Sequence, residues 1–323
     1  MKLKTIKTVD AVGHILCHDV TKIVPGEFKG RLFKKGHVVK EEDIPELLDA
    51  GKDILYVWEK LDGFVHENDA AERLKNIIIG DNLDISDIKE GKINLIASET
   101  GTLRIDTKAI YNINMIDEII VATKPNFQFV KKGDRVASTR VIPLIVDEKK
   151  LIEAEQFSGK LITIKPLVKK TVAMVTTGNE VFFGRIKDKF REVMAPKFEF
   201  FGCEFVGQTI VPDELKKVTG AIENYLKKGV DLIVCTGGMS VDPSDITPTA
   251  IMATGSDIIT YGIPVLSGSM TLIAYNGDTP ILGLPAGVLF SDKSIVDVIL
   301  HRLLCDDRVT REEVAEYGVG GLL

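Results

Sequence analysis

The sequence predicts an α/β protein in which a β-rich N-terminal region precedes a three-layer, doubly wound C-terminal domain. From Thr171 onward, apolar segments of strand length alternate with amphipathic segments of helix length, as in parallel βαβ units. Before that point, short apolar segments are broken by glycine and charge, which is typical of a small barrel or sandwich. Pro166 lies in a lysine-containing segment where the pattern changes, so we expect domains over residues 1–166 and 167–323.

Two segments of the N-terminal region predict helices. Glu41–Ala50 has the length of a short helix and is followed by Gly51, a residue that suits a helix end. Asn68–Ile79 is followed by Gly80 in the same way.

The C-terminal region predicts strands and helices in turn. Over Asp213–Lys228, apolar residues recur at the spacing of one helical face. The predicted strands cover residues 171–176, 203–211, 231–235, 258–261, 270–275 and 280–283. The predicted helices cover residues 188–202, 213–228, 247–253 and 291–304. We expect the final segment, GVGGLL, to be a flexible tail.

Composition excludes several classes of protein. A net charge of −6 argues against a nucleic-acid partner, because binding to the phosphate backbone needs a dense basic face. The sequence has no run of 18 apolar residues, so we expect no membrane-spanning segment. It also lacks an apolar signal core near its start, and its four cysteines have no CxxC spacing. These features predict a cytoplasmic protein with reduced thiols.

The segment Asp231–Thr247 predicts a ligand site. A short apolar strand runs into Gly237 and Gly238, which let the backbone turn tightly and approach a ligand closely. In open α/β sheets, ligands bind just beyond the carboxyl ends of the strands. A plain strand-to-helix turn is the alternative, with Asp245 and Thr247 as caps of the following helix.

Three motifs of the C-terminal region together resemble the molybdopterin-binding domain family. They are Thr177–Glu180 after the first strand, Thr236–Ser240 with Asp245 downstream, and Gly283–Gly287 before the last helix. Within this family, the chain is most similar to the molybdopterin molybdenumtransferases, which also have a longer N-terminal region.

The resemblance implies binding of adenylylated molybdopterin, release of AMP with the help of Mg²⁺, and insertion of molybdate. It implies catalytic roles for Glu180, Asp213 and Asp245, with Glu180 and Asp245 holding Mg²⁺. From the residues alone, Asp213 and Asp245 could instead cap helices. The residues implied to bind the pterin and its phosphates lie in the three motifs and in the loop before Met270: Thr177, Gly178, Gly237, Gly238, Ser240, Ser267, Gly268, Ser269, Pro285 and Gly287.

The chain departs from the family pattern at three places. Asn179 stands where an aspartate is usual, and Asp242 stands where a glycine is usual. The family's lysine-containing loop, which helps to hold molybdate, is replaced by residues 264–269, whose serines are uncharged donors.

These departures keep other functions open. The resemblance also implies a homodimer and a client molybdoenzyme. The alternatives are a non-catalytic carrier or sensor of molybdopterin or of the finished cofactor, and a domain for another phosphorylated metabolite.

Overall fold

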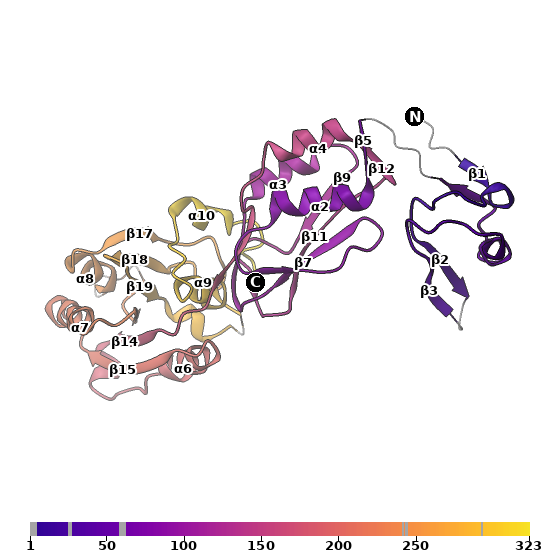
Figure 1. Ribbon diagram of the computed structural model, residues 1–323. Coiled ribbons are helices and arrows are strands. Elements are labelled where there is room, and N and C mark those ends of the chain that lie inside the picture. The colour runs from indigo at the N-terminus through magenta and orange to yellow at the C-terminus, as the bar shows by residue number, and fades with distance from the viewer. Residues whose placement is uncertain (1–4, 25–27, 58–62, 241, 243–244, 292) are drawn as a thin grey trace. The chain divides into compact units, whose positions relative to one another are not determined.

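A computed structural model of the chain (Figure 1) describes residues 5–24, 28–57, 63–240, 242, 245–291 and 293–323. The chain forms two compact units, and each is described by itself. The first unit comprises Met1–Ile96, Ile105–Lys124 and Arg135–Ile162, and the second comprises Ala97–Arg104, Pro125–Asp134 and Thr163–Leu323. None of the helices within the described ranges is long and apolar enough to span a bilayer.

The first unit begins with two small antiparallel sheets. Strand β1 (Thr5–Lys7) pairs with β4 (Ile54–Tyr56), and β2 (Val20–Val24) pairs with β3 (Phe28–Phe33). The segment predicted to be helical forms the 3-10 turn η2 (Glu41–Asp43) and α1 (Ile44–Asp49). Apolar side chains from these elements form a small core: Ala11, Leu16, Val20, Val39, Leu47 and Leu55.

The rest of the first unit is built around a four-stranded sheet in the order β6-β7-β11-β9. These strands are β6 (Leu83–Ile85), β7 (Lys92–Ala97), β11 (Arg135–Val141) and β9 (Ile119–Thr123). Alternate residues of β7 are buried, so the sheet has one covered and one partly open face. The helices are α2 (Glu67–Ile78), α3 (Thr107–Asn114) and α4 (Glu148–Glu155), and β5 (Phe64–His66) pairs with β12 (Ile145–Asp147).

The second unit contains a six-stranded sheet in the order β15-β14-β16-β19-β18-β17. Strands β14, β15, β16 and β19 run parallel, and β18 is antiparallel to both of its neighbours. The strands are β14 (Thr171–Thr177), β15 (Glu204–Val211), β16 (Leu232–Thr236), β17 (Asp257–Tyr261), β18 (Leu272–Asn276) and β19 (Thr279–Leu284). Each of the strands predicted after residue 170 is confirmed within a few residues.

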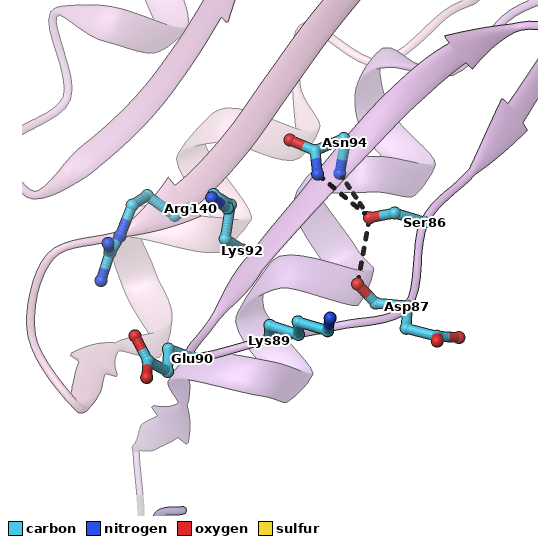
Figure 2. Close-up of a pocket in the computed structure, with 7 residues that line it drawn as sticks. All are labelled: Ser86, Asp87, Lys89, Glu90, Lys92, Asn94 and Arg140. Atoms are coloured by element: carbon cyan, nitrogen blue, oxygen red, sulfur yellow. Dashed lines mark hydrogen bonds between the residues drawn. The ribbon is translucent and has the colours of Figure 1, made fainter. Parts of the chain in front are cut away.

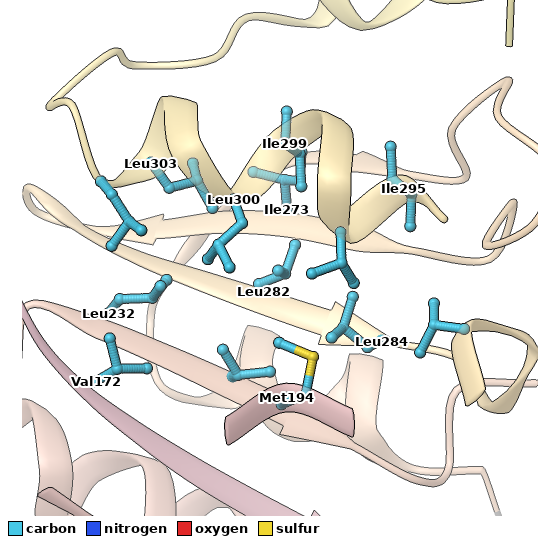
Figure 3. Packing of buried hydrophobic residues seen from close by; sticks show 14 of the residues in the cluster. Val172, Met194, Leu232, Ile273, Leu282, Leu284, Ile295, Ile299, Leu300 and Leu303 are labelled. Carbon is cyan, nitrogen blue, oxygen red and sulfur yellow. The ribbon is translucent and has the colours of Figure 1, made fainter. Parts of the chain in front are cut away.

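Helices cover both faces of this sheet, which confirms the three-layer arrangement. On one face, α6 (Phe190–Phe200) and α9 (Ile295–Leu303) pack on Val172 and its neighbours, as Figure 3 shows. On the other face, α7 (Leu215–Lys227) and α8 (Thr247–Ala253) pack on Ala173 and its neighbours. Because successive residues of β14 enter opposite cores, its sequence is continuously apolar from Val172 to Val175 rather than alternating.

A buried arginine joins the last helices of the second unit to two earlier segments. The side chain of Arg302 is 0% exposed, and its Nε donates to Asp307 Oδ2 at 2.7 Å. It also contacts the Glu313 carboxylate of α10 (Arg311–Glu316), and its guanidinium carbon lies 4.0 Å from the ring centre of Phe127. Arg104, in β8 (Gly101–Ile105), donates to Glu313 at 2.6 Å. The carboxylates of Asp307 and Glu313 thus satisfy a guanidinium that water cannot reach.

The predicted flexible tail is wrong. The backbone N–H of Leu266 donates to the Gly321 carbonyl at 2.8 Å, and the N–H of Leu323 donates to the Leu266 carbonyl at 3.1 Å. A Cβ on Gly321 would lie 2.1 Å from the carbonyl oxygen of Pro264, so this close contact requires glycine. The sequence predicts a tail here because the residues that hydrogen-bond to this last segment lie far away along the chain.

Burial of His301 predicts a loss of stability in acid. Its Nδ1 lies 2.7 Å from Thr102 Oγ1, and burial, with help from the charge of Arg302, lowers the pKa of His301 to about 4. The unfolded chain therefore binds a proton near pH 6.5 that the folded chain takes up only near pH 4. Between these values, wild type should lose stability relative to His301→Leu, by at most about 1.4 kcal/mol per pH unit. Urea unfolding at several pH values measures this difference, and a difference that does not change with pH would contradict it.

Candidate functional site

The three predicted motifs meet at one edge of the six-stranded sheet. Strands β14, β16 and β19 are parallel neighbours in the order β14-β16-β19, so their carboxyl ends lie together. The first motif follows Thr177, the second includes Thr236 and the third includes Leu284, which are the last residues of these strands. This edge is where open α/β sheets bind ligands.

The turn after β16 lies against the end of β14. A Cβ on Gly237 would be 2.0 Å from the Thr177 carbonyl oxygen, and one on Gly238 would be 2.9 Å from Thr247 Oγ1. Both glycines have positive φ, +82° and +55°, which favours glycine at each position. Thr176 Oγ1 lies 2.8 Å from Thr236 Oγ1 across the same pair of strands. The backbone is therefore brought close to the strand end, as the Gly-Gly sequence predicts.

Asp213 fixes the first motif rather than capping a helix. Its Oδ1 accepts a hydrogen bond from Thr177 Oγ1 at 2.7 Å, and its Oδ2 accepts one from the Asn179 N–H at 2.9 Å. Helix α7 instead has Glu214 as its N-cap, with no side-chain cap. The capping alternative for Asp213 is therefore wrong, because the carboxylate is drawn to the loop of the neighbouring strand.

Asp245 and Thr247 do not cap α8 either. The N-cap is Ile246, and it has no side-chain cap. Asp245 Oδ2 accepts from the Asp242 N–H at 3.1 Å. The Thr247 hydroxyl donates to the Gly237 carbonyl at 2.8 Å, so Thr247 holds the glycine turn. Residues 241, 243 and 244 of this loop lie outside the described residues.

The two predicted metal ligands follow different strands of this edge, Glu180 after β14 and Asp245 after β16. Glu180 is exposed in the short helix α5 (Asn179–Phe182), and its carboxylate has no hydrogen bond or ion pair within the described part of the chain. In the same ranges, no three His, Cys, Asp or Glu side chains gather closely enough to hold a metal by themselves. One or two carboxylates can hold Mg²⁺ when waters and substrate phosphates complete its shell. Glu180 and Asp245 have the donor chemistry of such a site.

The loop of residues 264–269, called the serine loop below, is hydrogen-bonded to the third motif. The Ser267 hydroxyl donates to the Gly287 carbonyl at 2.7 Å, and the Ser267 carbonyl accepts from the Ile295 N–H at 3.0 Å. Gly268 has φ +114°, and a Cβ there would be 2.3 Å from Ile295 Cγ2. Pro285 precedes the 3-10 turn η3 (Ala286–Leu289) that contains Gly287. The hydroxyl proton of Ser267 is thus used within the protein, and Ser269 is exposed.

Two residues of the edge were not predicted. The Tyr261 hydroxyl donates to the Met239 carbonyl at 2.9 Å and to the Ser240 carbonyl at 3.4 Å. Burial, and after it the charge of Asp245, raises the pKa of Tyr261 above its ordinary value. Gln208 Nε2 donates to Thr176 Oγ1 at 2.7 Å. Neither residue belongs to a motif: Tyr261 is connected with the site because it ends β17, and Gln208, within β15, because its side chain reaches Thr176 of β14.

Comparison with known proteins identifies the class of the second unit. Residues 173–304 match the family described as a probable molybdopterin binding domain, and residues 5–59 match a family described as a domain of unknown function. The C-terminal domain therefore belongs to the molybdopterin-binding domain family, as its motifs predict.

Individual relatives match only part of the chain. A molybdopterin molybdenumtransferase of Bacillus subtilis is 28% identical over 127 residues, which is 37% of this chain and 29% of the relative. A CinA-like protein of Picosynechococcus is 29% identical over 80 residues, 25% of this chain and 19% of the relative. The chain thus matches less than a third of the length of either. The solved structure of the molybdopterin biosynthesis enzyme MoaB from Thermus thermophilus is 21% identical, with a TM-score of 0.36, over 44% of this chain and 98% of that one.

The approach of Gly237 to β14 predicts opposite effects for two glycine substitutions. Gly237→Ala should lower the free energy of unfolding by about 1–3 kcal/mol or more, because the new methyl group meets a backbone carbonyl at positive φ. Gly220→Ala is the control, since Gly220 lies within α7 and a Cβ there meets nothing within 4 Å. It should raise the same free energy by about 0.5–1 kcal/mol. Urea unfolding compares them, and equal stabilities would show that the close approach is not a constraint.

Proposed function

We propose that the second unit binds molybdopterin at the carboxyl ends of β14, β16 and β19, and that the chain inserts molybdate into adenylylated molybdopterin with release of AMP. The observation that carries this proposal is the meeting of three family motifs at one sheet edge, with Gly237 packed against Thr177. The match of residues 173–304 to the molybdopterin binding domain supports it.

Backbone donors at the glycine turn suit the phosphates of this substrate. The N–H groups of Gly238, Met239 and Ser240 have no acceptor among the described residues. Thr247 and Tyr261 hold the carbonyl groups of the same turn, so its amides are fixed in place. Preorganised amides bind phosphate oxygens without a further cost of ordering.

The carboxylates of the edge suit a metal-assisted hydrolysis. Glu180 and Asp245 would hold Mg²⁺, which, when bound, offsets the charge of the phosphates and stabilises the departing AMP. Water adds across the phosphoanhydride bond, so that one phosphate stays on the pterin and AMP leaves. Asp213 holds the loop that carries Glu180, because its carboxylate bonds Thr177 and Asn179.

One observation favours a second function, the non-catalytic carrier or sensor. Molybdate needs donors of its own, and the hydroxyl of Ser267 already donates to Gly287. In that function the pterin binds at the same edge and is passed on without AMP release. The homodimer, the client molybdoenzyme and the cytoplasmic location stay predictions in both functions.

The role proposed for Asp245 predicts a change in AMP release. Asp245→Asn should slow Mg²⁺-dependent release of AMP from adenylylated molybdopterin by at least about tenfold, as expected for a lost charge-assisted contact. Asp278→Asn is the control, because Asp278 precedes β19 and so lies at the opposite end of that strand from Leu284. AMP can be measured by chromatography on variants whose urea unfolding is unchanged. Equal rates in the two variants would remove Asp245 from the metal site.

The serine loop predicts weak binding of molybdate. Neutral hydrogen bonds contribute about 0.5–1.5 kcal/mol each, whereas bonds from a charged donor contribute about 1.5–3 kcal/mol. Cofactor formation should therefore saturate only at high molybdate, measured by reconstitution of an apo-molybdoenzyme with protein, adenylylated molybdopterin and Mg²⁺. Saturation at low micromolar molybdate would contradict this expectation. Tight pterin binding without AMP release at any molybdate concentration would favour the carrier.

A further inference from the structure

The first unit contains a polar cavity of about 670 Å³ that the proposed function does not use. Its lining consists of polar and charged residues from β7, β11 and the loop after β6 (Figure 2): Ser86, Asp87, Lys89, Glu90, Lys92, Asn94 and Arg140. Small-molecule sites have volumes of about 300–1,000 Å³. A site of this size without apolar side chains suits a charged ligand.

Two cations of the lining lie directly opposite each other. Lys92 of β7 and Arg140 of β11 are paired residues of adjacent antiparallel strands. Both are half-buried and lie on the partly open face, because Ile93 and Val141 beside them are buried in the core. Like charges at paired positions of a sheet are destabilising unless something neutralises them.

Few groups of the protein itself neutralise the cations of the lining. In the described ranges, the ammonium groups of Lys89 and Lys92 make no ion pair, and Arg140 donates only from Nε, to the Val141 carbonyl at 3.3 Å. Asp87 and Glu90 line the cavity but form no ion pair with these cations. Figure 2 shows the Asp87 carboxylate turned away from Arg140. The lining therefore has one more cation than carboxylates.

Glu67, the first residue of α2, is a further carboxylate of this unit, and its charge interacts with that of Arg140. It is 9% exposed, and burial raises its pKa above the ordinary value, whereas the charge of Arg140 lowers it. Glu67 does not line the cavity, so its attraction to Arg140 acts from outside it. The opposed pair of cations thus faces the cavity without an ion pair in the described ranges.

The neutral groups of the lining are held in place by one another. Asn94 Nδ2 donates to Ser86 Oγ at 3.3 Å, and Asn94 Oδ1 accepts from Ser138 Oγ at 2.9 Å. Ser86 Oγ also accepts from the Asn94 N–H at 3.1 Å and donates to the Asp87 carbonyl at 3.0 Å. These bonds fix one wall of the cavity and leave the ammonium groups of Lys89 and Lys92 and the terminal NH₂ groups of Arg140 as its unused donors.

We propose that this cavity binds a small oxyanion with two or more negative charges, of the phosphate class, through Lys89, Lys92 and Arg140. Two negative charges match the opposed pair of cations, and the planar guanidinium of Arg140 can donate two parallel bonds to one phosphate group. The site belongs to the first unit, so it does not depend on molybdopterin binding by the second.

Calorimetric titration of the full chain with inorganic phosphate and with pyrophosphate tests the proposal. Lys92→Met should bind about tenfold more weakly than wild type, the scale of one lost charge-assisted bond. Lys108→Met is the matched control, because Lys108 is exposed in α3 of the same unit and does not line the cavity. It should bind as wild type does.

A second experiment measures how the repulsion between Lys92 and Arg140 affects the melting temperature. Without ligand at low salt, Lys92→Met should melt at or above the temperature of wild type, because it relieves the opposed charges. Phosphate should then raise the melting temperature of wild type and Lys108→Met more than that of Lys92→Met, at matched ionic strength. Equal phosphate affinity in all three proteins, or none in any, would overturn the proposal. Stronger binding of succinate than of phosphate would overturn the assignment to the phosphate class.

Discussion

The close approach of Gly237 to the Thr177 carbonyl is the constraint on which the candidate site depends. Parallel pairing places Thr176 opposite Thr236, so the chain that leaves β16 must cross the end of β14. Only a residue without Cβ can cross there, since a Cβ would lie 2.0 Å from the oxygen. The first and second motifs therefore share one surface because of backbone packing, before any ligand is considered.

The hydrophobic core of the second unit also holds the turn at Gly237 and Gly238 in place. Met239, 3% exposed, packs in the core beneath α7 and α8, and Gly283 of β19 makes room for it, because a Cβ on Gly283 would lie 2.8 Å from Met239 Cε. Gly283 of the third motif thus leaves the space that the side chain of Met239, in the second motif, occupies. Apolar burial and the position of the turn amides are two effects of one packing arrangement, which makes the turn a rigid support for a ligand.

The sequence predicts secondary-structure elements better than it predicts the hydrogen-bond partners of individual residues. The strands after residue 170 could be predicted because each is a continuous apolar run between turn residues, a local property. Helices α3 and α4 were missed because they are short and lie among strand-like segments. The capping roles of Asp213 and Asp245 were wrong, since Asp213 bonds Thr177, 36 residues earlier, and only the strand order brings the two together. Tyr261 and the last residues of the chain have the same kind of distant partner.

The two proposed sites offer opposite charges to the same class of ligand. The edge of the second unit gathers carboxylates, among them Glu180, Asp213 and Asp245, so phosphate can bind there only where amides and a cation offset their field. The cavity of the first unit carries its own cations on paired strand positions, Lys92 and Arg140. A site that must release its product gains from a dissociable cation, whereas a site with fixed cations holds its anion by charges that cannot leave. On this physical ground, the site proposed at the edge of the second unit suits turnover, and the site proposed in the first unit suits retention.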